Sequence, residues 1–171
     1  MRNIIDKIED KDVIDFLEYL KYERRMSVNT IDSYGENLLL ISDILKKKLI
    51  NLDTNDVRNF LLNIGAVPRT KAHYLTVLNS FYRYLIFMDK LDNNPCDGIK
   101  SPKLEKKLPT YLTSEEVDKL LNMRLTKPVD YRNKAMLELI YATGARISEI
   151  TNLELNQIDY DECVIRVTGK G

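Results

Sequence analysis

Apolar side chains recur at helical spacing in four successive segments within the first 91 residues of this 171-residue chain. Spacings of three and four residues place such side chains on one helix face, which must be buried against other helices. The four segments are residues 12–24, a helix capped by Ser27 or Asn29, a short helix capped by Asp53 or Thr54 and ended by Gly65, and residues 69–89. The sequence therefore predicts a four-helix domain over residues 1–91.

Residues 92–110 break the helical pattern with three prolines, one glycine and four lysines, a composition typical of a linker. Beyond it, Thr113 and Glu116 predict a capping box at the start of a new helix. Further helices are expected over about 131–142 and 146–153, each with an apolar stripe that should be buried. The stripe expected on the first of these three helices is Val117, Leu120 and Leu121.

Alternating side chains over residues 163–168 predict a strand, which the turn signal Gly169-Lys170-Gly171 follows. A lone strand pair is marginally stable, so this pattern predicts that residues 111–171 are incomplete as a domain. The expected fold class of the whole chain is mainly α.

Composition excludes several classes of protein. Two cysteines and one histidine, His73, are too few for a four-ligand zinc site. The apolar runs are shorter than the roughly 20 residues of a membrane span. The first residues contain no apolar block of the signal-peptide kind, which together with the cysteine usage predicts a cytoplasmic protein. Basic and acidic side chains both total 26, and a net charge of zero argues against a nucleic-acid partner.

The charge is unevenly distributed, however. Residues 57–88 carry Arg58, Arg69, Lys71 and Arg83 and no acidic side chain. A local positive surface matters more than the total charge when a polyanion binds. The alternative is that this stretch is acid-free by chance, as part of an apolar helix pair.

The polar face of the fourth predicted helix contains two cations, a histidine and two hydroxyls, without an acid. These residues are Arg69, His73, Thr76, Ser80 and Arg83, spaced by three or four positions. Such side chains suit phosphate oxygens and base edges of DNA. A merely solvated face is the alternative, although solvated faces usually mix glutamate with lysine.

Two motifs in the second domain, YATGARISEI at 141–150 and VIRVTGKG at 164–171, resemble known catalytic motifs. They are similar to the first catalytic-arginine motif and the lysine-bearing hairpin of the tyrosine site-specific recombinases (phage integrase family), particularly the bacterial Xer-like members. Upstream, SVNT at 27–30 with Tyr34, FYRYL at 81–85, Asn94-Pro95 and Leu108-Pro109 resemble the core-binding domain and linker of that family. The resemblance implies a SAM-like four-helix domain followed, over residues 111–171, by the truncated start of an α+β catalytic domain.

In this family a tyrosine hydroxyl attacks the scissile phosphate, giving a 3′-phosphotyrosyl intermediate and a free 5′-hydroxyl without a metal or other cofactor. The resemblance assigns Arg146 to the non-bridging oxygens, which a planar guanidinium can hold in pairs. It assigns Lys170 to protonation of the leaving 5′-oxygen, and Glu149 to a structural role beside Arg146. The implied partners are double-stranded DNA and other recombinase protomers in a tetramer on two sites, with no membrane partner.

The resemblance also implies that the second and fourth helices face adjacent major grooves. The residues expected to contact DNA are Ser27, Asn29, Thr30, Arg69, Lys71, His73, Thr76 and Arg83.

The 171 residues contain no counterpart of the family's His-x-x-Arg pair, of its further His or Trp, or of its nucleophilic tyrosine. His73 lies in the first domain, and Tyr160 precedes the predicted strand. We therefore expect this chain to match the N-terminal part of such a recombinase and to bind DNA without cleaving it. Two alternatives stay open: a non-catalytic remnant or partner module of an intact recombinase, and a helical interaction domain with accidental motif matches.

Overall fold

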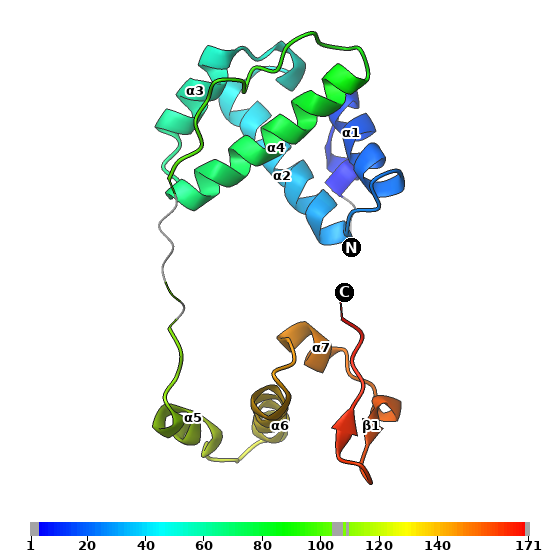
Figure 1. The fold of residues 1–171 in the computed structure, drawn as a ribbon, viewed down its shortest axis with the longest axis vertical. Helices are drawn as coiled ribbons and strands as arrows, with labels where there is room; N and C mark the ends of the chain where they lie inside the picture. Colours follow the sequence, from blue (N-terminus) through cyan, green and yellow to red (C-terminus); the bar gives the residue numbers. More distant parts are fainter. Residues whose placement is uncertain (1–3, 104–107, 109, 170–171) are drawn as a thin grey trace. The chain divides into compact units, whose positions relative to one another are not determined.

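A computed structural model describes residues 4–103, 108 and 110–169. The chain divides into two compact units, Met1–Lys106 (unit 1) and Lys107–Gly171 (unit 2). Within the described residues there are seven α-helices and one small two-stranded sheet (Figure 1). The mainly α fold predicted from the sequence is therefore confirmed. No helix in the described part of the chain is both long and apolar enough to span a membrane.

Unit 1 is built from short 3₁₀ turns and four α-helices whose ends follow the local sequence chemistry. The elements are η1 (Ile4–Lys7), α1 (Lys11–Tyr22), α2 (Val28–Leu45), η2 (Leu49–Asn51), α3 (Thr54–Asn63) and α4 (Pro68–Phe87). Ser27 and Asp53 are the N-caps of α2 and α3, because each side chain accepts backbone N–H groups of the first turn. The predicted role of Gly65 is wrong: α3 ends at Asn63, and the extended backbone of Ile64 terminates it.

The core of unit 1 lies between α1, α2 and α4. Phe16 is fully buried, and its ring centroid is 5.5 Å from that of Phe81 and 5.4 Å from that of Tyr84. Tyr82 is also buried, and its hydroxyl donates a hydrogen bond to the backbone oxygen of Leu49 at 2.8 Å. Burial raises the pKa of Tyr82 well above its ordinary value, so this hydroxyl remains a donor that ties η2 to α4.

The N-terminal segment packs onto α2 at a glycine. A Cβ built on Gly35 would lie 2.8 Å from Cγ1 of Ile4 and 3.2 Å from Cδ1 of Leu17. Ile4 is itself buried, so its side chain occupies the space that any larger residue at position 35 would need. The glycine thus allows η1 to belong to the core rather than to a peripheral tail.

Part of the segment predicted as a linker packs against unit 1. Asn94 and Cys96 are buried, and Asn94 Nδ2 donates to Asn79 Oδ1 on α4 at 2.9 Å. Asn94 Oδ1 accepts the backbone N–H of Cys96, also at 2.9 Å. Burial raises the pKa of the Cys96 thiol to about 12. The sequence pattern did not reveal this packing because it depends on one asparagine and one cysteine rather than on a periodic stripe.

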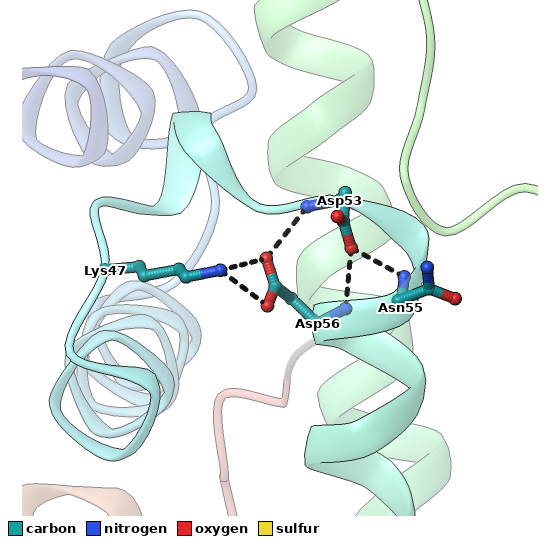
Figure 2. Close-up of polar contacts among 4 residues, drawn as sticks. All are labelled: Lys47, Asp53, Asn55 and Asp56. Atoms are coloured by element: carbon teal, nitrogen blue, oxygen red, sulfur yellow. Dashed lines mark hydrogen bonds and ion pairs between the residues drawn. The ribbon is translucent and has the colours of Figure 1, made fainter.

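The start of α3 is held by a carboxylate cluster and one lysine (Figure 2). Asp53 Oδ1 accepts the backbone N–H groups of Asn55 and Asp56, both at 2.8 Å. Asp56 Oδ2 accepts the backbone N–H of Asp53 at 3.2 Å, which completes a capping box. Lys47 Nζ reaches both carboxylate oxygens of Asp56, at 2.8 and 2.9 Å. This ion pair connects the segment after α2 to the first turn of α3.

Lys47→Met is expected to raise the pKa of Asp56. The hydrogen bond from Lys47 and that from the backbone of Asp53 hold this pKa below its ordinary value. Because the folded-state pKa is lowered, the stabilising contribution of the carboxylate is present above its unfolded pKa and is lost as pH falls through the folded pKa. An NMR titration of the Asp56 carboxyl carbon measures the change. The matched variant Lys48→Met should leave it unaltered, and an unshifted Asp56 in Lys47→Met would contradict the assignment.

Unit 2 consists of three α-helices, a 3₁₀ turn and one small sheet among the described residues. They are α5 (Ser114–Leu121), α6 (Pro128–Thr143), α7 (Ile147–Thr151), η3 (Leu155–Gln157), β1 (Ile158–Asp159) and β2 (Val164–Ile165). The strands pair antiparallel, with Ile158 opposite Ile165 and Asp159 opposite Val164. The predicted capping box of Thr113 and Glu116 is confirmed.

Two expectations about unit 2 are wrong. The strand predicted over 163–168 is only Val164–Ile165, because Cys163 has a left-handed backbone (φ 53°) that belongs to the turn. The stripe on α5 is not buried: Leu120 is 45% exposed, and Ile150 is the one large apolar side chain that is buried among the described residues of this unit. The described elements of unit 2 therefore leave the apolar faces of α5 and α6 only partly buried, and Ile147 of α7 is 66% exposed.

Candidate functional site

The carboxylate of Glu149 holds the side chain of Arg146, the arginine of the 141–150 motif. Gly144, with a left-handed φ of 66°, ends α6, and Arg146 then becomes the N-cap of α7. Glu149 Oε2 accepts the backbone N–H of Arg146 at 2.8 Å, and Oε1 accepts from its Nη1 at 2.9 Å. These bonds, the backbone one foremost, hold the pKa of Glu149 below its ordinary value. Glu149 therefore stays ionised while it orients the guanidinium.

The rest of the Arg146 guanidinium faces solvent. The Arg146 side chain is 76% exposed, whereas that of Glu149 is only 12% exposed. Both border a hollow of about 500 Å³ that also contains polar side chains from α7 and η3. Its lining residues are Arg146, Ser148, Glu149, Asn152, Gln157, Val167 and Thr168. The arrangement suits a tetrahedral oxyanion, which a guanidinium can bind through two parallel N–H groups. Lys170 lies outside the described residues.

In unit 1, the hydroxyls predicted to contact DNA at the start of α2 are partly engaged in capping. Ser27 Oγ accepts the backbone N–H of Thr30 at 3.3 Å and lies 2.9 Å from Thr30 Oγ1. Asn29, in the same first turn, is exposed and makes no side-chain hydrogen bond within the described residues. The cap therefore leaves Asn29 as the side chain of this turn that is most available to a ligand.

The polar face of α4 is exposed at both ends. Arg69 and Arg83 are exposed and form no ion pair with any described residue, and Thr76 is exposed between them. Thr76 Oγ1 donates to the backbone oxygen of Ala72 at 2.9 Å, so the hydroxyl can still accept a hydrogen bond. Because 14 residues of helix separate them, the two arginines are about 21 Å apart along the axis.

Lys71 is separated from this face. It lies two residues after Arg69, which on a helix turns it to a different side. Lys71 Nζ donates to the backbone oxygen of Leu62 at 3.4 Å and borders a smaller hollow with Arg58 and Lys100. The candidates predicted on α4 are therefore divided between two surfaces.

A hollow of about 670 Å³ extends the α4 face toward the turn between α1 and α2. Thr76, Ser80 and Arg83 line it from α4, and Arg24 lines it from the turn between α1 and α2. Tyrosine and phenylalanine rings supply most of the apolar lining, which is Tyr19, Leu20, Met26, Tyr34, Tyr84 and Phe87. No acidic side chain borders the hollow, and Arg24 makes no ion pair with the described residues. An anionic ligand with flat or apolar parts matches this lining.

Arg24 was not among the sequence candidates. It lies in a stretch, residues 1–56, that is acidic on average, and Glu23 precedes it directly. Only the folding of the α1–α2 turn against α4 brings Arg24 to the same hollow as Arg83. A weak signal was available in the paired cations Arg24-Arg25, which one residue, Met26, separates from the cap residue Ser27.

His73 is held by two residues of α2 that the sequence did not single out. Its Nε2 lies 3.1 Å from Asn37 Nδ2 and 3.4 Å from Ser33 Oγ. Its ring packs edge-on to that of Tyr34, with centroids 6.3 Å apart. The four-residue spacing of Ser33 and Asn37 places both on one side of α2, but nothing in the sequence shows that this side meets α4.

Two family models match the chain. The model described as "Phage integrase, N-terminal SAM-like domain" matches residues 13–87, and that described as "Phage integrase family" matches residues 110–171. The first therefore runs from Val13 in α1 to the end of α4 and includes the Arg24–Arg83 hollow, and the second covers the Arg146 site.

Similar proteins include "Tyrosine recombinase XerD" of Pasteurella multocida, 37% identical over 91% of this chain and 55% of that protein. "Tyrosine recombinase XerC" of Proteus mirabilis is 36% identical over 91% of this chain and 53% of its own length. The chain thus spans about half the length of these relatives. Among solved structures, "Integrase from mycobacterium phage Brujita" has a TM-score of 0.54 at 22% identity, over 93% of this chain and 54% of that one. That likeness concerns the fold alone.

Proposed function

The chain belongs to the phage integrase family of tyrosine recombinases, and on that premise we propose that it acts in site-specific DNA recombination, with unit 1 holding duplex DNA. The observation that carries the proposal is the Arg24–Arg83 hollow and its continuation along α4. Two cations without ion-pair partners among the described residues, in a hollow whose lining contains no acidic side chain, are suited to neutralise phosphates. The exposed Arg69 extends the same face to the other end of the helix.

Arg146 is proposed to bind the scissile phosphate in unit 2. Phosphoryl transfer places charge on the non-bridging oxygens in the transition state, and a guanidinium held by Glu149 is already oriented for two of them. Lys170 is proposed to protonate the leaving 5′-oxygen, as the family's lysine does. Glu149 acts through Arg146 and does not itself touch DNA in this scheme.

The 171 residues are proposed to bind DNA without cutting it, because they contain one histidine and no His-x-x-Arg pair. Double-stranded DNA is the proposed ligand, and other recombinase protomers are the proposed protein partners. The alternative role, a module that pairs with intact recombinase, is favoured by the uncovered apolar side chains of unit 2, such as Tyr111 and Leu155, which are 89% and 79% exposed.

Incubation with a labelled suicide duplex, which traps any covalent intermediate, tests both parts of this proposal. The expected result is reversible binding whose affinity falls steeply as salt rises, because counterions are released from neutralised phosphates. No labelled protein band should survive denaturation. A covalent adduct would refute the absence of cleavage, and binding that is absent or insensitive to salt would refute the assignment of DNA to unit 1.

A further inference from the structure

The hydrogen bonds that join α2 to α4 at Asn37 and His73 fix two polar side chains on the proposed DNA face. Asn37 Nδ2 donates to the backbone oxygen of Ser33 at 2.7 Å and is 3.1 Å from His73 Nε2. Ser33 Oγ is 3.4 Å from the same Nε2, and Tyr34 contacts the imidazole edge-on. The Asn37–His73 pair is therefore held from three sides, which restricts the rotation of both side chains.

The pair presents both a donor and an acceptor. Asn37 Nδ2 donates to the backbone oxygen of Ser33, so in this orientation it also donates toward His73 Nε2, and Nδ1 is the ring nitrogen left to donate to a ligand. Asn37 Oδ1 and His73 Nδ1 have no hydrogen-bond partner among the described residues, and His73 is exposed. A phosphate oxygen is an acceptor and favours cations, whereas base edges in the major groove offer donors and acceptors side by side. The chemistry of the pair thus matches a base edge better than a phosphate.

The position of the pair along α4 supports the same conclusion. His73 lies between the exposed arginines, about 6 Å from Arg69 and about 15 Å from Arg83 along the helix axis. The major groove is about 12 Å wide, so a helix seated in it with cations on both sides of His73 places those cations near the backbones and the uncharged side chains between them near the bases. Phosphate contacts fix the position of a protein on DNA, and contacts to base edges provide sequence discrimination.

We propose that Asn37 and His73 together read base edges in the major groove, with Ser33 as the residue that positions them. This inference rests on the proposed function, because it assumes that the α2–α4 face binds duplex DNA. It adds a division of roles: Arg24, Arg69 and Arg83 supply affinity for any sequence, and the Asn37–His73 pair supplies preference among sequences.

The test is selection of bound duplexes from a randomised library by the wild-type chain, Asn37→Ala and His73→Ala. The selected duplex and its single-base-pair variants are then titrated. The wild type should lose about 10- to 100-fold in affinity when the DNA base pair that Asn37 and His73 contact is replaced. Both variants should bind the original and the replaced duplex equally. Their affinity for random DNA and their salt slope should stay within about twofold of the wild type, because no cation is removed.

Asn59→Ala, an exposed asparagine on α3, is the matched control and should retain the wild-type preference. Ser33→Ala should weaken the preference partially, since it removes the hydroxyl that contacts His73 Nε2 and leaves the backbone oxygen that Asn37 contacts. The inference is overturned if the wild type selects no base pair, if the variants select the same base pairs as the wild type, or if they lose affinity for every sequence with a shallower salt slope. A wild type that binds no duplex would instead overturn the proposed function on which the inference rests.

Discussion

The double variant Arg69→Glu/Arg83→Glu is expected to lose at least about 100-fold in affinity for duplex DNA near 0.1 M salt, and its salt dependence should become shallower by about two ions. Each substitution removes a cation at one end of the exposed α4 face and puts an anion in its place. Both side chains are exposed and have no ion-pair partner among the described residues, so unit 1 should remain folded. Fluorescence anisotropy of a labelled duplex at several salt concentrations measures both quantities.

Lys11→Glu/Lys21→Glu is the matched control, because it changes the net charge by the same amount on exposed lysines of α1. Its effect should be several-fold smaller, since neither Lys11 nor Lys21 lines the Arg24–Arg83 hollow or lies on α4. An equal loss in both double variants would mean that total charge governs binding. Unchanged binding by Arg69→Glu/Arg83→Glu would remove α4 from the proposed interface.

Phe16→Ala should destabilise unit 1 by about 3–5 kcal/mol, a large part of the 5–15 kcal/mol typical of a whole domain. The ring is fully buried and contacts the rings of Phe81, Tyr84 and Tyr34, so alanine leaves a cavity between three helices. The chain has no tryptophan to report on this site. Native-state hydrogen exchange of the α1 and α4 amides measures the free energy of unfolding of unit 1 separately from unit 2.

Phe87→Ala provides the comparison within the same group of aromatic residues. Phe87 is 69% exposed, and its ring centroid is 6.3 Å from that of Tyr19. Phe87→Ala should lower the free energy of unfolding by less than about 1 kcal/mol, because the exposed ring buries little apolar area in the folded state. If the two variants had equal effects, the centre of unit 1 would not be at Phe16.

Local chemistry explains which parts of the fold could be predicted from the sequence. Ser27, Asp53 and Thr113 act through backbone groups two or three residues away, so their caps follow from a few neighbouring residues. Gly65 was misjudged because a glycine after a helix need not adopt the left-handed conformation. The stripe on α5 was misjudged because periodicity indicates which face is apolar, while burial also requires a covering element.

The residues of the candidate sites also differ in whether local sequence was enough to predict them. Arg146 and Glu149 were found from one contiguous motif, since they are one helical turn apart and contact each other directly. Arg24 and Asn37 were not, because each acquires its role from a residue on another helix: Arg24 from Arg83 and Asn37 from His73. The separation of Lys71 from Arg69 could be predicted from helical geometry alone. Contacts between helices depend on how the helices pack, which could not be predicted from the periodicity of a single sequence.

The close approach of Ile4 to Gly35 means that the four-residue η1 contributes a buried side chain to the stability of unit 1. Glycine inside a helix costs about 1 kcal/mol relative to alanine, and here that cost is offset by an isoleucine buried from another segment. Because η1 precedes α2 in the chain, its residues find their binding place only after α2 has formed. Deletion of Ile4–Lys7 would leave a groove along α2 beside Leu17, so it would remove part of the core.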